Sequence, residues 1–380
     1  MNLIRKMVIA GSWCLVAACG QETAPTSQAI ATEAAVTSPS IGAVKVEHGE
    51  TPLDFIVSWQ AEVPVNIYVA EAPQTPMDEL QLLAENATGG SFQWQADAPA
   101  KRRYFSVKAS TADEVVNAAV RLLPLEGGRN FRDLGGYPTA DGKSVKWGKV
   151  YRSGVMAGLT DQDYAYLSSL GISTVCDYRS AGERTDEPTQ WRAGEIEYVT
   201  FPDPATETGS SFMSVLQKPQ ATPQMVADAM ALGYAQIAKQ HSAAYTYMFD
   251  QLAAGNTPLA FNCSAGKDRA GISAALLLTA LGVPREYVVK DYALSEQVVD
   301  YMQEFLSDTS ADQNDEESPY AYLSRLPREL VAPLMRSDPL YIETALNDLA
   351  AEYGSVMSFI QTELDVTDAE LRTIRAALLH

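Results

Sequence analysis

The sequence predicts two folded regions of different class. A small all-β sandwich is expected over residues 41–125, and an α/β domain with a largely parallel central sheet is expected over residues 126–380. The first prediction depends on short alternating apolar runs between turn-rich segments, such as FIVSW at residues 55–59. The second depends on a change, near residue 126, to buried strands that alternate with longer helical patterns. A length of 380 residues also exceeds that of one typical domain.

The N-terminal segment has the pattern of an export signal followed by a linker. A charged start and a short apolar run predict a signal peptide over residues 1–18, because the run is too short to remain as a membrane span. The run ends in Val-Ala-Ala-Cys, which resembles the bacterial lipobox. We therefore expect lipidation of Cys19 and a lipoprotein of the cell envelope, at the outer membrane or its periplasmic face. The alternative is an ordinary secretory signal with a chance cysteine. Residues 19–40, rich in Ala, Thr, Ser and Pro, predict a flexible linker.

The charge balance restricts the possible partners. The chain has 28 Lys and Arg against 48 Asp and Glu, a net charge of −20, which argues against nucleic acid and anionic membrane surfaces as partners. It also opposes long-range attraction of a phosphorylated ligand, so an anion site must be built from local donors. The only histidines, His48, His241 and His380, are too few and scattered for a metal centre, and we expect neither a metal nor another cofactor.

The first region resembles a fibronectin type III domain in its aromatic pattern. Trp59 falls late in an early apolar run, and Tyr104 with Val107 and Ala109 falls in a later one. The resemblance implies a spacer or docking module. The alternative is that Trp59 and Tyr104 are simply core aromatic residues of a sandwich.

One segment of the second region combines the features of an anion site. Residues 258–263 (PLAFNC) predict a buried strand that ends at Cys263, and an apolar run from Ile272 to Leu281 predicts a helix. The loop between them is expected at the helix N-terminus, where converging backbone N–H groups and the helix dipole favour an anion. Its small residues allow a tight curl of the backbone. The predicted phosphate-binding residues are Ser264, Ala265, Gly266, Lys267, Asp268 and Arg269.

Two residues of this segment carry specific chemistry. Cys263 stands where the same field favours a thiolate, which makes it a candidate nucleophile. Arg269, six residues further on, can present its planar guanidinium to phosphate oxygens through two parallel hydrogen bonds. The spacing alone is weak, but it is specific in combination with the strand, the small-residue loop and the apolar helix.

Residues 261–271 (FNCSAGKDRAG) resemble the loop of the atypical bacterial tyrosine and lipid phosphatases, whose pattern is close to HCxAGKDR[ST]G. Further segments match that family in order and extend the resemblance over essentially residues 126–380. They are GRNFRDLGG at 128–136, VYRSG at 150–154, DYRS at 177–180, DYALS at 291–295 and YGSV at 353–356.

The resemblance implies a three-layer cysteine-phosphatase fold and hydrolysis of phosphate monoesters through a phosphocysteine at Cys263. A phosphorylated protein or a phosphoinositide is the implied substrate. Asp268 is the implied general acid, and Lys267 could contact a second phosphate or an inositol ring. Asp203, between two prolines, is a rival acid, with a plain turn residue as its alternative. Arg132, Asp133 and Arg179 either brace the loop or meet substrate, with structural ion pairs as the alternative.

Two residues depart from the family pattern. Asn262 replaces the histidine before the nucleophile, so the thiolate is expected to be less stabilised. Ala270 replaces a hydroxyl residue that eases thiolate departure, so a slow second step is expected. These departures motivate an alternative function, a phosphoprotein-binding pseudophosphatase with little turnover. A sulfurtransferase or arsenate reductase using the same thiol is a further alternative, but it gives no reason for the segment at 128–136.

Two other features allow alternative interpretations. Cys176 is expected to be a core cysteine or, if its strand neighbours that of Cys263, the partner in a reversible protective disulfide. The helical stretch over residues 206–239, with Phe212 near its start, resembles the lid of this family or forms an ordinary packed helix pair.

Overall fold

The computed structural model describes residues 41–204, 209–306 and 319–380. The predicted signal peptide, Cys19 and the predicted linker lie outside these ranges. No helix within them combines the length and apolarity that a membrane crossing requires.

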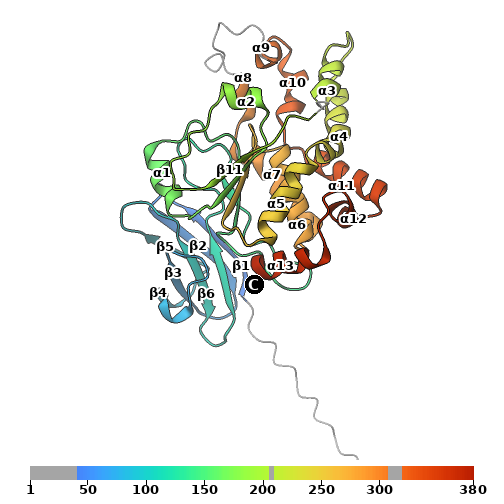
Figure 1. The fold of residues 1–380 in the computed structure, drawn as a ribbon. Helices are drawn as coiled ribbons and strands as arrows, with labels where there is room; N and C mark the ends of the chain where they lie inside the picture. Colours follow the sequence, from blue (N-terminus) through green and yellow to red (C-terminus); the bar gives the residue numbers. More distant parts are fainter. Residues whose placement is uncertain (1–40, 205–208, 307–318) are drawn as a thin grey trace, which may run out of the picture. The chain divides into compact units, whose positions relative to one another are not determined.

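Residues 41–119 form two antiparallel sheets, which Figure 1 shows in blue to teal, as predicted for an all-β region. One sheet has the order β1-β2-β5 and the other β4-β3-β6-β7. Alternate side chains of β2 and β3, such as Trp59 and Ile67, are buried between the sheets. The strands are β1 (Ile41–His48), β2 (Asp54–Ala61), β3 (Val65–Ala70), β4 (Gln81–Ala87), β5 (Ser91–Gln95), β6 (Tyr104–Ala109) and β7 (Val115–Ala119).

The sequence patterns predicted four of these strands and missed β4, β5 and β7. None of the residues of β4 is buried, and Leu82 is 48% exposed, so this strand lacks the apolar alternation that marks a buried face. Strand β7 is short, and its two buried residues are the alanines Ala118 and Ala119, which give a weak strand signal.

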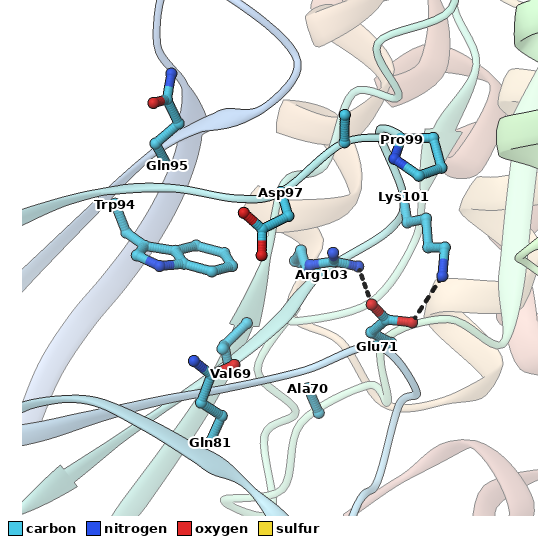
Figure 2. A pocket seen from close by; sticks show the side chains of 11 residues that line it. Val69, Ala70, Glu71, Gln81, Trp94, Gln95, Asp97, Pro99, Lys101 and Arg103 are labelled. Carbon is cyan, nitrogen blue, oxygen red and sulfur yellow. Dashed lines mark hydrogen bonds and ion pairs between the residues drawn. The ribbon is translucent and has the colours of Figure 1, made fainter.

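A cavity of about 420 Å³ opens on this β region (Figure 2). Trp94 and Asp97 line it opposite Arg103, and Glu71 forms ion pairs with Lys101 at 3.1 Å and with Arg103 at 3.0 Å. All of its lining residues belong to residues 69–103, so the cavity is separate in sequence from the loop that follows Cys263.

The second region is built on a five-stranded sheet of order β11-β10-β12-β9-β8. Strands β9 to β12 are parallel, and the short edge strand β8 is antiparallel to β9. The predicted mixed α/β class with a largely parallel sheet is therefore confirmed. The strands are β8 (Arg132–Asp133), β9 (Val150–Ser153), β10 (Thr174–Asp177), β11 (Glu197–Thr200) and β12 (Leu259–Asn262).

Both faces of this sheet are buried. Phe261 and Cys176 lie in a core built with helices α4 to α7 and α10 to α13, whereas Ala260 and Val175 lie in a second core with α1. Figure 1 shows the first group of helices in yellow to red. The helices are α1 (Asp161–Ser168), α2 (Ala181–Asp186), α3 (Gly209–Leu216), α4 (Pro223–Gln240), α5 (Ser242–Ala253), α6 (Arg269–Ala280), α7 (Arg285–Val298), α8 (Tyr301–Leu306), α9 (Pro319–Ser324), α10 (Arg328–Met335), α11 (Pro339–Tyr353), α12 (Val356–Thr362) and α13 (Asp368–Leu378).

The central strand β12 places the predicted loop at the carboxyl edge of the sheet. Asn262 is the last residue of β12, Cys263 follows it, and α6 begins at Arg269, three residues earlier than the apolar run indicated. Since β12 lies between β10 and β9, the loop has neighbours on both sides. Carboxyl ends of parallel strands are where open α/β sheets bind ligands.

Candidate active site

The backbone carbonyl groups of the loop that follows Cys263 accept hydrogen bonds from donors in several other segments of the chain. Ser264 O accepts from Val155 N at 3.0 Å and from Arg129 Nη1 at 3.1 Å. Ala265 O accepts from Tyr301 Oη at 2.9 Å. Because these carbonyls face outward, the loop amides are left to face the concave side, which is the arrangement of an anion-binding nest.

Gly266 allows the tightest part of this curl. Its φ is +74°, and a Cβ there would lie 2.5 Å from Gly154 N, so neither the conformation nor the space suits a side chain. Its carbonyl accepts from Arg152 Nη2 at 2.7 Å and from Asn130 Nδ2 at 3.1 Å. Its own N–H donates to Cys263 Sγ at 3.2 Å. The sulfur is therefore in direct contact with a backbone amide of the loop.

Arg269 is clamped by a residue that the sequence analysis missed. Its two terminal nitrogens donate to the two carboxylate oxygens of Glu183, at 2.7 and 2.6 Å. Glu183 also accepts from Ser264 Oγ at 2.6 Å, so it ties the arginine to the loop. Burial by itself would raise the pKa of Glu183, but the hydrogen bonds from Arg269 and Ser264 outweigh it and lower the pKa to about 2. A sequence signal exists, since Ser180 and Glu183 form a capping box at the start of α2.

Asp268 stands at the entrance to α6. Its side chain is 26% exposed, and Oδ1 accepts from Lys267 Nζ at 2.7 Å and from Tyr234 Oη. Lys267 is itself buried. A second tyrosine, Tyr245 on α5, donates to Arg269 O at 3.0 Å. The predicted acid, lysine and arginine thus gather with Cys263 at one end of α6.

A buried charge cluster supports the loop from below. Asp291 on α7 accepts from Arg152 Nη1 at 2.6 Å and from Arg132 Nε at 3.2 Å, and all three side chains are at most 1% exposed. Arg152 connects this cluster to Gly266 O. The contacts of Arg132 fit the structural ion pair among its two alternatives. Arg132 also donates to Asn130 Oδ1, and the side-chain nitrogen of Asn130 donates to Gly266 O.

Replacing Asp291 with asparagine is expected to lower the free energy of unfolding by about 3–5 kcal/mol, because two buried guanidinium groups lose their counter-ion. Burial would raise the pKa of Asp291, but Arg132 and Arg152 hold it well below its usual range, so the carboxylate is charged at neutral pH. Urea denaturation measures the change. The control is Glu286→Gln on the same helix, whose pair with Lys290 is exposed and 3.8 Å long, so less than about 0.5 kcal/mol is expected. Equal shifts in the two variants would contradict the argument.

The other predicted secondary residues have structural contacts. Asp133 is fully buried and accepts from Arg102 Nη2 at 2.9 Å and from two backbone amides, contacts that fit the structural ion pair among its two alternatives. Arg179 pairs with Asp177 at 2.8 Å. Asp203 is exposed and accepts at 2.9 Å from the backbone N–H of Ala181, the first residue of α2.

The residue before Cys263 is a buried asparagine. Asn262 Nδ2 donates to Asp177 Oδ1 at 3.0 Å. Its Oδ1 is buried and has no hydrogen-bond partner among the residues that the structure describes. An amide therefore fills the histidine position through one hydrogen bond to a carboxylate and carries no positive charge toward the thiol.

The register of the sheet separates the two buried cysteines. Cys176 pairs with Phe261, and Tyr178 N bonds to Asn262 O, so Tyr178 is the neighbour of Cys263. An offset of two residues on neighbouring strands puts the two cysteine Cα atoms about 8 Å apart, beyond the ~7 Å that a disulfide spans without backbone movement. Burial raises the pKa of the Cys176 thiol to about 12. These features fit a core cysteine.

The segment predicted as a lid or a packed helix pair forms α3 and α4. Leu216 of α3 is buried in the same core as Val226 and Met230 of α4. The side chain of Phe212 lies outside the described residues. This packing fits an ordinary packed helix pair. That the segment closes over the loop as a lid stays a prediction.

The fold and this arrangement define an α/β protein with a buried cysteine in a tightly curled loop between the central strand β12 and helix α6. Comparison with known proteins gives the family: the tyrosine phosphatase family model matches residues 123–380, and the chain belongs to that family, an enzyme class. A tyrosine-protein phosphatase homologue of Cupriavidus necator is 32% identical over 246 residues, 64% of this chain and 84% of that protein. The triple specificity protein phosphatase PtpB of Mycobacterium tuberculosis is 28% identical over 282 residues, 69% of this chain and 99% of that protein.

Proposed function

We propose that the protein hydrolyses phosphate monoesters through a phosphocysteine at Cys263. In the first step, Cys263 Sγ forms a bond to phosphorus, the bond to the leaving oxygen breaks, and Asp268 gives that oxygen a proton. In the second step, water attacks phosphorus, the S–P bond breaks, and Asp268 takes the proton of the water. The observation that carries the proposal is the set of outward-held carbonyls, which leaves the loop amides for the equatorial phosphate oxygens. Arg269, whose Nη1 and Nη2 each donate to Glu183, adds the N–H groups that Glu183 does not occupy.

We further propose that the substrate is a phosphorylated protein or a phosphoinositide. The name of the Mycobacterium tuberculosis relative, a triple specificity protein phosphatase, supports a broad choice. For Lys267 to meet a second phosphate, its ammonium group has to exchange its contact with Asp268 for one with the substrate. Pocket depth distinguishes these substrates, and a panel of phosphotyrosine, phosphoserine and phosphoinositide substrates ranks them directly.

Residues before the phosphatase region have proposed roles of their own. We infer that residues 41–125 are a fibronectin type III-like module, and the sheet orders β1-β2-β5 and β4-β3-β6-β7 support this assignment.

We also propose that Cys19 anchors the protein to the cell envelope through lipid. Metabolic labelling with a radiolabelled fatty acid, lost in Cys19→Ala, tests the anchor.

The experiment that tests the proposed reaction uses the chain from residue 20 onward, which contains all of the described residues. Hydrolysis of an aryl phosphate is followed with the product and the covalent phosphoenzyme measured in parallel. Continuous turnover, with a covalent phosphoenzyme in the wild type that is absent from Cys263→Ser, supports the proposal. A single burst equal to the enzyme present would instead support the alternative, a phosphoprotein-binding pseudophosphatase with little turnover.

Ala270 is the observation that favours this alternative. It is fully buried at the start of α6, where the related loops have a hydroxyl residue. Ala270→Ser is expected to raise kcat by about tenfold, because a hydrogen bond to the departing thiolate contributes on the order of 1.5 kcal/mol. The value of kcat/KM should change less than about twofold, since the first step does not use that bond. Burst kinetics measure both quantities. Ala274→Ser, one turn further along α6 and equally buried, is the control, and an equal gain in that variant would contradict the explanation.

A further inference from the structure

Asp268 is not used in the way that its position suggests. It is the N-cap residue of α6, where an aspartate usually accepts from the backbone amides of the first turn, yet its side chain makes no capping hydrogen bond. Its Oδ1 accepts instead from Tyr234 Oη and from Lys267 Nζ. Across the described ranges, no hydrogen bond to its other oxygen, Oδ2, is found. The carboxyl group is therefore fixed by one oxygen, and the other is left for the reaction.

The donor to Asp268 belongs to a pair of tyrosines. Tyr234 lies on α4 and is 1% exposed, and its hydroxyl lies 2.6 Å from that of Tyr292 on α7. Because the Tyr234 proton is donated to the carboxylate, the contact between the phenols is a donation from Tyr292 to Tyr234. Burial, and then the charge of Asp268, raise the pKa of Tyr234 well above its usual value. The phenol thus stays protonated, and stays a donor, at any pH used in an assay.

The position of Tyr292 depends on the loop sequence itself. A Cβ at Gly271 would lie 2.9 Å from Cδ2 of the Tyr292 ring, so the glycine two residues after Arg269 leaves the space that the ring occupies. Tyr292 directly follows Asp291, which holds Arg152 beneath Gly266. Two adjacent residues of α7 therefore support the two halves of the site, the oxyanion loop and the carboxyl group.

We propose that Tyr234, held by Tyr292, is a positioning residue that orients Asp268 through Oδ1 and favours its carboxylate form, and so assists the second, hydrolytic step. The inference deepens the proposed function and rests on it. Two donors on one oxygen stabilise negative charge on the group. The carboxylate is the form that accepts the proton of the attacking water, whereas the first step uses the protonated form. The hydroxyl of Tyr234 therefore acts on the two steps in opposite directions.

Several ionisable and charged groups surround Asp268, and each single variant changes one of these side chains while it leaves the others in place. The ionisable and charged groups around it are Lys267 and Arg269 in the loop and at the start of α6, Tyr234 on α4, Tyr245 on α5, Tyr292 on α7, Tyr301 on α8 and Tyr341 on α11. Only Tyr234 and Lys267 donate to its carboxylate within the part of the chain that the structure describes.

The test compares pH profiles of wild type and Tyr234→Phe with an activated aryl phosphate. The acidic limb of kcat is expected to move up by about one pH unit, so that kcat on that limb falls about tenfold, because a charge-assisted donor to the base is lost. An activated leaving group needs no acid, so kcat/KM should change less than about twofold. Tyr292→Phe is expected to move the limb in the same direction by a smaller amount, and the double variant should match Tyr234→Phe.

Tyr341→Phe is the matched control, because Tyr341 is an equally buried tyrosine that packs on Tyr234 but donates to Pro333 O. Its profile should superimpose on that of the wild type. An unmoved limb in Tyr234→Phe, or an equal shift in Tyr341→Phe, would overturn the inference. Full activity of Asp268→Asn would also overturn it while leaving the phosphatase reaction intact. Absence of any turnover or burst in the wild type would overturn the proposed reaction together with this inference.

Discussion

Cys263→Ser is expected to abolish turnover, with a loss of kcat on the order of 10⁴-fold or more, because a neutral hydroxyl replaces the nucleophile while the rest of the site stays in place. The site without the thiolate should still bind a tetrahedral oxyanion, since the loop amides and Arg269 are unchanged. Release of an aryl alcohol measures the first effect, and tungstate binding by calorimetry measures the second.

Cys176→Ser is the matched control for this experiment. Both cysteines are buried and free, but the pKa of the Cys176 thiol is raised to about 12 by burial, so it is not a thiolate at neutral pH. Turnover within about twofold of the wild type is expected, because Cys176 has no part in the reaction. Loss of activity in Cys176→Ser with an unchanged melting temperature, or residual turnover in Cys263→Ser, would contradict the assignment of the nucleophile.

The second large effect is expected for Arg269→Lys. A lysine keeps the charge but cannot make two parallel hydrogen bonds, neither to phosphate nor to Glu183, so kcat/KM should fall by about 10³-fold. The pKa of Glu183 is about 2, well below its usual value of 4.5, so the carboxylate clamp is charged throughout an assay range of about pH 5 to 8. The comparison is therefore not affected by titration of the clamp.

Arg336→Lys serves as the control for this substitution, because Arg336 pairs with Glu296 at an exposed position and has no role in the loop. Its kcat/KM should match that of the wild type. A further variant, Glu183→Gln, separates positioning from chemistry: it removes the clamp and keeps the arginine, so an intermediate loss is expected. A loss in Arg269→Lys no larger than that in Glu183→Gln would show that the arginine does not meet the phosphate.

The local part of the site was predictable from the sequence. A buried strand, a run of small residues and an apolar helix determine the path of the chain near Cys263, and the spacing to Arg269 follows from that path. The capping box of Thr367 and Glu370 at the start of α13 is equally local, because its two residues are three positions apart. In each case the residues that interact are within a few positions of one another.

The partners from distant segments were not predictable in the same way. Tyr234 reaches Asp268 across 34 positions, and Glu183 reaches Arg269 across 86, so both contacts depend on how α4 and α2 pack and not on any spacing. The partner of Asp133 was also not predictable from its position in the sequence. It neighbours Arg132 on β8, and successive side chains of a strand face opposite sides, so Arg132 turns toward Asp291 and Asp133 turns toward Arg102.

The buried pair of Arg102 and Asp133 has a consequence for the ancestry of this chain. Arg102 belongs to the region predicted as the sandwich and Asp133 to the region matched by the family model, and their side chains are 1% and 0% exposed. A gene fragment that encoded only the later region would leave a carboxylate buried without its counter-ion, which costs about 3–5 kcal/mol. Recombination that replaces one region by an unrelated one would therefore destabilise the protein through the loss of this ion pair. The two regions are expected to be inherited together.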